Sequence, residues 1–430
     1  MSHRPLLIYL AALGTAFTVL APRAAADDQA GVTFAWKTPS TEAPRRRTPR
    51  LVNYCHISSE LAGYRTSELE KMLAQWDVLV LFPYEQVSEQ SLVFPDKIRA
   101  WNPKVRILAW MPLQGPSGAL WRRSIPEASL ALWSGHDTNG KIVTAPWGEV
   151  VMNPVADGRG WPRHVISFLE EKCLVRPSNN YDGVMLDCLS SAPMFGIDAN
   201  RDGKRDQRDT EQWREAYLWM LQELRRRHPH ILLIGNAGQP LSARDPYLQW
   251  LNGSLHENAL GNQWGTGQWQ QVWDGYRAAV SGSEKQGRET MHFIVVDVRM
   301  GRSLEEARQL DHLTATDLRR MRLGLCTSLL LDGGYFGFDR GDCLHGQLWW
   351  FEEYDADIGA PGERHRNGAW GAGIYSRQYD RGLVIVNTHD KPVTVNLRVA
   401  HFDYTTKKIA QKHVIPPWDG RILRAEGGEQ

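Results

Sequence analysis

Residues 181–188 read Tyr-Asp-Gly-Val-Met-Leu-Asp-Cys, a short apolar run enclosed by Asp182 and Asp187. Similar β-rich runs recur along the chain, and helical patterns separate several of them. The strand-like runs are 51–56, 77–82, 105–111, 183–187, 231–235, 254–257, 292–298 and 328–331. The helical patterns are 67–75, 210–227, 268–280 and 316–322. Eight strands with intervening helices over about 280 residues predict an α/β fold of the (β/α)8 TIM barrel type, which typically takes roughly 250 residues.

A doubly wound parallel sheet is the alternative architecture. It is less favoured because no Gly-rich phosphate-binding loop follows any early strand. From about Ala369 the apolar residues change to period two, which is typical of antiparallel strands. These later runs are 373–376, 382–387, 393–399 and 413–415. We therefore expect an irregular lead-in at 27–49, a barrel at 50–368 and a small antiparallel, β-sandwich-like domain at 369–430.

The first 26 residues have the features of a secretory signal peptide. Arg4 precedes an apolar run at 6–20 that is too short to span a bilayer comfortably, and Ala24-Ala25-Ala26 suits the signal peptidase. An uncleaved anchor is the alternative. Cleavage after Ala26 removes two arginines and changes the formal charge from +1 to −1, since 48 basic and 49 acidic residues remain. We expect a secreted or periplasmic protein with no membrane span after cleavage.

The composition narrows the class of ligand. A formal charge near zero argues against a nucleic-acid partner, because neutralising phosphates requires an excess of basic residues. Tryptophan is abundant, with 18 in 430 residues. Its flat rings suit a ligand with apolar faces and hydroxyl edges, such as a polysaccharide, although most of these tryptophans should belong to the core.

Two acidic residues end predicted strands and form the candidate catalytic pair. In a TIM barrel the catalytic groups lie at the carboxyl ends of the strands. Asp187 ends the fourth run, and Glu257 ends the sixth. Glycosidic bond cleavage needs one ionised and one protonated carboxyl group. We predict Asp187 as the nucleophile and Glu257 as the general acid/base, with the charge of Asp187 helping to keep Glu257 protonated.

Other residues near strand ends are candidates for binding sugar hydroxyls or stacking on sugar rings. These substrate-binding candidates are Tyr84, Trp110, Asn236, His256, Trp264, Asp297 and Asp332. Each has a structural alternative, as do the two acids, since strand-end polar residues commonly form hydrogen bonds or ion pairs. Asp182 begins its strand and suits a turn or cap.

Several of these stretches resemble a known family. They are the YDGVMLD run, the strand end His256-Glu257-Asn258-Ala259, the segment LLLDGGYFGFDRGD at 329–342, and Trp349-Trp350-Phe351-Glu352-Glu353-Tyr354-Asp355. Over roughly residues 50–425 the chain is similar to the bacterial proteins grouped as hypothetical glycosyl hydrolase family 15. More distantly, it resembles the endo-α-1,4-polygalactosaminidases. That resemblance implies an Asp ending the fourth strand and a Glu ending the sixth, which match Asp187 and Glu257.

Residues 198–209 have the spacing of an EF-hand calcium loop. Oxygen-bearing side chains stand at loop positions 1, 3, 5, 9 and 12, and Gly203 stands at position 6, where the chain must turn sharply. The predicted ligands are Asp198, Asn200, Asp202, the backbone carbonyl of Lys204, Asp206 and Asp209. The pattern resembles the calcium loops of dockerin modules. We expect a structural Ca²⁺ between the fourth strand and its helix; the alternative is a solvated loop of mixed charge.

Taken together, these patterns favour an exported glycoside hydrolase acting on a polysaccharide, with retention if the two carboxyl groups lie close together. A non-catalytic saccharide-binding protein on a barrel scaffold is the main alternative. A calcium-dependent hydrolase of ester or amide bonds is a third, but the chain lacks a nucleophile–His motif such as GxSxG.

Overall fold

The computed structural model describes most of the chain from residue 33 onward. The described ranges are 33–34, 37–42, 44, 47–55, 66–82, 95–117, 119–174, 181–237, 245–257, 259–260, 269–299, 302–341, 345–363 and 365–426. The predicted signal peptide at 1–26 lies outside them, as do Tyr84 and Trp264.

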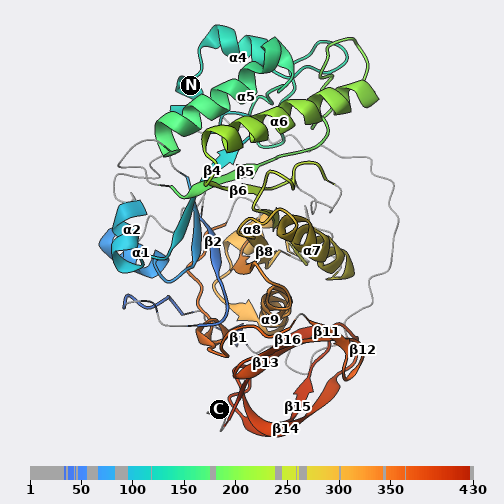
Figure 1. Cartoon of the computed structure of the whole chain (residues 1–430). Coiled ribbons are helices and arrows are strands. Elements are labelled where there is room, and N and C mark those ends of the chain that lie inside the picture. The colour runs from blue at the N-terminus through green and yellow to red at the C-terminus, as the bar shows by residue number, and fades with distance from the viewer. Residues whose placement is uncertain are drawn as a thin grey trace.

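The main body is a barrel of eight parallel strands surrounded by helices, as predicted (Figure 1). The strands are β2 (Val52–Cys55), β3 (Val78–Leu81), β4 (Arg106–Pro112), β5 (Gly183–Asp187), β6 (Leu232–Gly235), β7 (Gly253–His256), β8 (His292–Asp297) and β10 (Gly334–Asp339). They pair in chain order from β2 to β10. A parallel bridge between Leu51 and Phe336 brings the first and last strands together, which closes the barrel.

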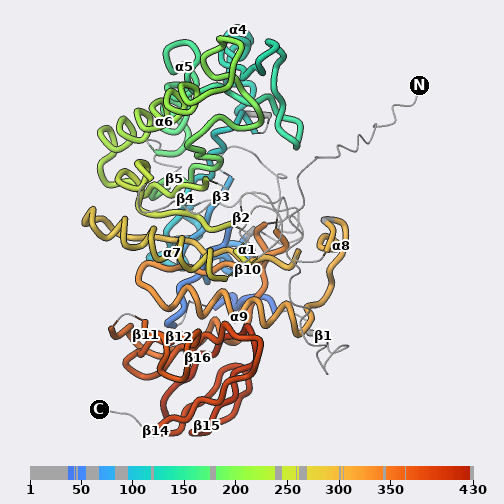
Figure 2. Tube along the Cα trace, turned by 90° about the vertical axis from the view of Figure 1, so that its right-hand side faces the viewer, coloured from blue at the N-terminus to red at the C-terminus, as the bar shows by residue number. Residues whose placement is uncertain are grey.

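The larger helices cover the outside of the strands (Figures 1 and 2). They are α1 (Thr66–Leu73), α2 (Pro95–Trp101), α5 (Ala156–Leu169), α6 (Gln207–Arg227), α7 (Trp269–Glu284) and α9 (Ala315–Leu329). The shorter elements are α3 (Ala119–Arg123), α4 (Glu127–Trp133), η2 (Glu170–Leu174), α8 (Leu304–Arg308) and η4 (Glu352–Asp355). In the described part of the chain, no helix is long and apolar enough to cross a membrane.

The barrel interior is filled by alternate residues of the strands. Successive side chains of a strand point to opposite faces, so residues two positions apart share a face. A buried apolar cluster contains Trp110, Met185, Ile234 and Leu255 together with residues of the other strands. Residues two positions after three of these members therefore share the inward face at the carboxyl end of the barrel. They are Asp187, Asn236 and Glu257.

The prediction of the eighth strand at 328–331 was wrong. Those residues form the end of α9 and the turn after it, and β10 begins at Gly334. The helix starts at a capping box formed by Thr314 and Asp317 and continues through nine buried positions. It packs on the barrel on one side and on the C-terminal sheet on the other, so its second half is buried all round. A helix of that kind and a buried strand have the same sequence signature.

The C-terminal part is a small antiparallel β-domain, as predicted, although its strands join into one sheet rather than two. The strands are β11 (Arg366–Gly368), β12 (Gly371–Tyr379), β13 (Gly382–Asn387), β14 (Val393–Asp403), β15 (Ile409–Ile415) and β16 (Asp419–Ala425). Their order is β11-β12-β13-β16-β14-β15. The strand β16 was not predicted. Two short strands, β1 (Thr33–Phe34) and β9 (Leu313–Thr314), pair separately.

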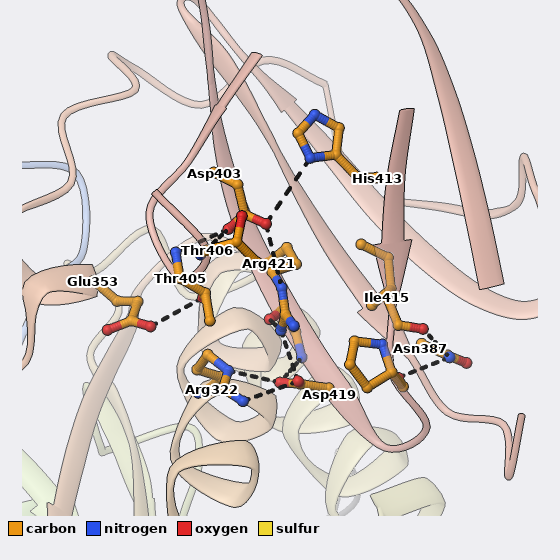
Figure 3. Close-up of polar contacts among 12 residues, drawn as sticks. Arg322, Glu353, Asn387, Asp403, Thr405, Thr406, His413, Ile415, Asp419 and Arg421 are labelled. Carbon is orange, nitrogen blue, oxygen red and sulfur yellow. Dashed lines mark hydrogen bonds and ion pairs between the residues drawn. The ribbon is translucent and has the colours of Figure 1, made fainter. Parts of the chain in front are cut away.

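A buried ionic network joins this domain to α9 of the barrel (Figure 3). Arg322 of α9 donates two hydrogen bonds, of 2.8 and 3.0 Å, to the carboxylate of Asp419, which is fully buried. Arg421 lies 2.7 Å from Asp419 and 3.5 Å from Asp403. The backbones are also close, because a Cβ at Gly420 would lie 2.7 Å from the carbonyl oxygen of Arg322. These contacts fix the β-domain against the barrel.

Candidate active site

The two predicted catalytic carboxylates meet at the mouth of the barrel, linked by one amide. The Nδ2 of Asn236 lies 2.8 Å from Asp187 Oδ1 and 2.6 Å from Glu257 Oε2. The sum of those two distances limits the separation of the two carboxylate oxygens to about 5.4 Å. Sequence reasoning placed each residue at a strand end, and the structure brings all three together.

Asp187 is held by donors on both of its oxygens. Trp110 Nε1 donates to Oδ2 at 3.0 Å, and the backbone N–H of Cys188 donates to Oδ1 at 2.9 Å. Burial and the negative charge of Glu257 raise the pKa of Asp187 to about 7, and the hydrogen bonds oppose this rise only in part. Because the two carboxyl groups are coupled, the proton belongs to the pair, which retains it up to near-neutral pH.

Glu257 contacts a histidine that the sequence analysis did not identify. His345 Nε2 lies 3.0 Å from Glu257 Oε1, and His345 Nδ1 lies 2.8 Å from Asp339 Oδ2. The ring of Tyr54 packs on the imidazole with the centroids 4.6 Å apart. Burial, followed by the charges of Asp187 and Glu257, raises the pKa of the Tyr54 hydroxyl, which therefore stays neutral. Trp110 and Asn236 thus contact Asp187, and Asn236 and His345 contact Glu257.

Asp339 was missed because the eighth strand was placed too early in the chain. It ends β10 and lies two positions after Gly337 and four after Tyr335, which packs in the barrel interior. Applied to the correct strand, the strand-end rule would have found it. His345 follows β10 in a loop with no periodic pattern, so the sequence alone carried no signal for it.

Two predicted substrate-binding residues have other roles in the structure. Trp110 is only 3% exposed and donates to Asp187, so it positions the carboxylate and has no open face for stacking on a sugar. His256 lies between Leu255 and Glu257 in the chain, so its side chain points to the opposite face of the strand, away from the barrel interior. Its ring packs near Tyr276 of α7, with the centroids 5.7 Å apart. Burial lowers the pKa of His256 to about 4, so this imidazole is neutral.

The two remaining aspartates lie at opposite ends of the barrel. Asp297 ends β8 at the mouth, where its Oδ1 accepts the N–H of Arg299 at 2.6 Å. Burial raises the pKa of Asp297 to about 6, with the Arg299 hydrogen bond opposing and the charge of Asp339 adding to the rise. Asp332 precedes β10 at the other end and forms an ion pair of 2.6 Å with Arg377 of the β-domain. The structure therefore places Asp332 away from the mouth, whereas its prediction as a substrate contact rested on the misplaced strand.

The 198–209 loop is built around hydrogen bonds from its own backbone. Gly203 has a φ of +84° and donates to Asp198 Oδ2 at 2.7 Å. Asp209 accepts from the N–H groups of Ala199 and Asn200, and with Asp206 it forms the capping box of α6. The other oxygen of Asp198 is buried and has no hydrogen-bond partner. Among the described residues, no three His, Cys, Asp or Glu side chains gather closely enough to hold a metal ion.

No protein-family model and no curated protein matches this chain. Among solved structures, it is similar to a noncanonic maltogenic α-amylase from Thermotoga neapolitana, with 9% identity, 88% of this chain and 98% of that chain covered, and a TM-score of 0.45. It is also similar to the glycoside hydrolase domain of PelA from Pseudomonas aeruginosa, with 18% identity, coverage of 68% and 95%, and a TM-score of 0.38. A third is the GH36 α-galactosidase AgaA from Geobacillus stearothermophilus, with 9% identity, coverage of 89% and 56%, and a TM-score of 0.45. Similarities at this level do not define a family for the chain.

Proposed function

We propose that this chain is a glycoside hydrolase that cleaves a polysaccharide with Asp187 as nucleophile and Glu257 as general acid/base. The observation that carries the proposal is the pair of carboxylates held at the barrel mouth by one shared amide, Asn236. The pKa of about 7 for Asp187 supports a pair that holds one proton at near-neutral pH. One acid and one base side by side are what glycosidic hydrolysis requires.

The short separation favours retention of configuration. Retaining enzymes keep their carboxyl groups about 5–5.5 Å apart, whereas inverting enzymes leave about 6.5–9.5 Å to admit a water. An upper limit of about 5.4 Å between the nearest oxygens lies in the retaining range. A water molecule would not fit between the carboxylates and the sugar in the way that inversion needs.

In the first step an oxygen of Asp187 bonds to the anomeric carbon while the bond from that carbon to the leaving oxygen breaks. Glu257 gives its proton to the leaving oxygen. In the second step Glu257 takes a proton from water, the water oxygen bonds to the anomeric carbon, and the bond to Asp187 breaks. Both carboxyl groups return to their starting states, and one water is consumed for each bond cleaved.

A non-catalytic saccharide-binding protein is a weaker explanation of this site. Placing two carboxylates together in a largely buried position is unfavourable unless cations neutralise them. A binding protein could present hydroxyl and amide groups instead and avoid that penalty. At Asp187 the unfavourable charge persists as a raised pKa, which suits a group that must exchange protons or form a bond.

The test is hydrolysis by the protein lacking residues 1–26. We would screen it against bacterial exopolysaccharides and α-1,4-linked galactosaminan, following new reducing ends and the anomer first released. Asp187→Asn and Glu257→Gln should each lower turnover by at least about 10²–10⁴-fold while the protein stays folded. Asp274→Asn, on the exposed face of α7, is the matched control and should retain activity. Normal turnover by either site variant would contradict the assignment.

We also propose that the 198–209 loop binds Ca²⁺ as a structural ion. The support is its EF-hand spacing together with the buried, unpartnered oxygen of Asp198, since a buried acceptor without a partner is unfavourable. Arg201 is turned outward onto the carbonyls of Leu132 and Ser134, which moves its positive charge away from the ligands. Binding would require the acidic side chains to turn inward, because Asp206 and Asp209 now cap α6.

Calorimetry with Ca²⁺ and the melting temperature with and without chelator test this site without reference to activity. Binding should disappear in Asp198→Asn. It should persist in Asp137→Asn, whose carboxylate lines the same hollow of about 350 Å³ but lies outside the loop. The calcium proposal would be refuted if adding Ca²⁺ gave no heat of binding and chelator left the melting temperature unchanged.

Export completes the proposal. The exopolysaccharides proposed as substrates lie outside the cytoplasm, and residues 1–26 have the pattern of a signal peptide. Mass spectrometry of the protein recovered from a secreting host should give an amino terminus at Asp27. An intact first 26 residues on the cell-associated protein would contradict export by cleavage.

A further inference from the structure

We propose that Asp339 and His345 form a proton-holding unit with Glu257, in which the imidazole stores the proton that Glu257 delivers. This inference rests on the proposed hydrolase function and deepens it. His345 and Asp339 are positioning residues here, because they act through Glu257 and not on the sugar.

The three groups lie in one line of hydrogen bonds. Asp339 Oδ2 is 2.8 Å from His345 Nδ1, and His345 Nε2 is 3.0 Å from Glu257 Oε1. A carboxylate accepts hydrogen bonds, so Asp339 keeps the proton of the ring on Nδ1. The state of Nε2 can then change. It donates to ionised Glu257 when the ring is charged, and it accepts from protonated Glu257 when the ring is neutral.

The surrounding structure fixes the line of hydrogen bonds. The N–H of Gly341 donates to Asp339 Oδ1 at 2.8 Å. Gly341 has a φ of +74°, and a Cβ there would lie 2.9 Å from the Cβ of Asp297, so only glycine fits this turn. On the other side the Tyr54 ring packs on the imidazole. His345 is only 2% exposed and cannot rotate into solvent.

The charges facing His345 are mostly negative. Asp339 and Glu257 contact it directly, Asp297 lies near enough to be influenced by its charge, and Tyr54 is neutral. The nearby cation Arg340 is engaged elsewhere, with Gln347 and the carbonyls of Ala307 and Arg308. Burial alone lowers the pKa of His345, but Asp339 and Glu257 raise it by more, to well above its usual range. The ring therefore carries a proton at neutral pH.

This stored proton resolves a conflict within the pair. Asp187 must be ionised to attack the sugar, while Glu257 must supply a proton. Transfer of one proton from Nε2 to Glu257 Oε1 leaves neutral His345 and protonated Glu257 with no change in net charge. When Glu257 delivers this proton to the leaving oxygen, Glu257 becomes ionised and His345 stays neutral. The water of the second step returns the proton, so each turnover balances.

The first experiment is a titration of the imidazole that needs no substrate. The chain has 14 histidines, and the ring signals of ¹⁵N-labelled His345 are identified by their loss in His345→Gln. In the wild type we expect this ring to titrate well above the ordinary pKa of an imidazole, because Asp339 and Glu257 stabilise its charged form. Asp339→Asn and Glu257→Gln should each lower that midpoint by about one unit or more. His256→Asn removes another buried imidazole and should leave it unchanged.

The second experiment is the pH dependence of kcat/KM on α-1,4-linked galactosaminan. Asp339→Asn should move the alkaline limb to lower pH by about one unit or more and leave the acid limb in place. A merely structural role would lower the rate at every pH without moving either limb. The proton-holding unit is refuted if the His345 ring is neutral at pH 6.5. It is also refuted if neither Asp339→Asn nor Glu257→Gln moves the midpoint of the His345 titration. Because the titration uses no substrate, failure to hydrolyse any polymer would refute only the proposed function.

Discussion

The barrel mouth and the junction between α9 and β16 both bury a pair of acidic residues, but they neutralise them differently. At the mouth, Asp187 and Glu257 share a neutral amide, and one imidazole contacts one of the two. At the junction, Asp403 and Asp419 face two guanidinium groups. Burial and Glu257 raise the pKa of Asp187, whereas Asp419 offsets the effect of burial on Arg322 and raises the pKa of that guanidinium.

The difference separates the proposed reactive site from a structural one. Matched charges at the junction have no reason to exchange protons, and they lock two domains together (Figure 3). At the mouth His345 contacts Glu257, whereas Asp187 accepts hydrogen bonds from neutral donors, so its charge is held in place by the surrounding fold at some loss of stability. The type of residue is the same in both places, so the partner decides whether a buried aspartate stabilises the fold or performs chemistry.

The largest expected effect comes from breaking the junction. Asp419→Asn leaves two buried arginines short of a carboxylate, and removal of one partner of a buried ion pair destabilises a protein by about 3–5 kcal/mol. The thermal midpoint of unfolding should fall accordingly. Arg322→Met combined with Asp419→Leu should recover part of the loss, since no charge of that pair is then left unmatched. If Asp419→Asn lowered the free energy of unfolding by less than about 1 kcal/mol, that result would contradict the structural role.

At the mouth, removing a buried acidic group should raise the stability of the protein instead of lowering it. Because the pKa of Asp187 is raised in the folded state, its contribution favours folding below about pH 4 and is lost as pH rises through about 7. Asp187→Asn should therefore be more stable than the wild type above pH 7, by about 1.4 kcal/mol for each pH unit by which folding raises the pKa of this carboxyl group. Denaturant unfolding at several pH values measures this. The advantage should be smaller in a Glu257→Gln background, where the neighbouring charge is absent.

A smaller effect is expected for Trp110, the donor that holds the proposed nucleophile Asp187. Trp110→Phe keeps most of the ring but loses the 3.0 Å hydrogen bond to Asp187. A hydrogen bond to a charged group contributes about 1.5–3 kcal/mol, so kcat should fall roughly 10- to 100-fold. The acid limb of the pH–rate profile should also move to higher pH, because the donor stabilises the ionised form. An unchanged acid limb would argue against a role for Trp110 in holding the carboxylate.

The smallest effect is expected for Asp332→Asn. Its side chain is 52% exposed and pairs with Arg377 at the end of the barrel opposite the mouth. Arg377 is itself buried, with a side chain only 2% exposed, but the asparagine oxygen can still accept its hydrogen bond. The free energy of unfolding should therefore fall by about 1 kcal/mol, near the upper end for half-exposed pairs, and hydrolysis should not change. A clear loss of activity in the folded variant would return Asp332 to the site and overturn its structural placement.

The sequence predicted the structure correctly where a segment followed one hydrophobic period along its whole length. The run at 183–187 and the strand end at His256-Glu257 each lie on a single strand, so the inward face and the carboxyl end could both be inferred. The prediction failed at 328–331, because α9 is covered on two sides and its buried end has the sequence pattern of a strand. That single error moved Asp332 into the predicted site and hid Asp339. His345 lies in a loop without a periodic pattern, so its position in the site could not be predicted from the sequence.

The sequence by itself determined the alternation of strands and helices, the β-domain and the two strand-end acids, because hydrophobic periodicity is a local property that follows from backbone geometry. Only the tertiary structure decided which of these side chains contact one another. Asn236 links Asp187 to Glu257, and His345 links Glu257 to Asp339, through contacts between residues 6 to 88 positions apart. Closure of the barrel creates those contacts, since it brings the carboxyl ends of all its strands to one mouth.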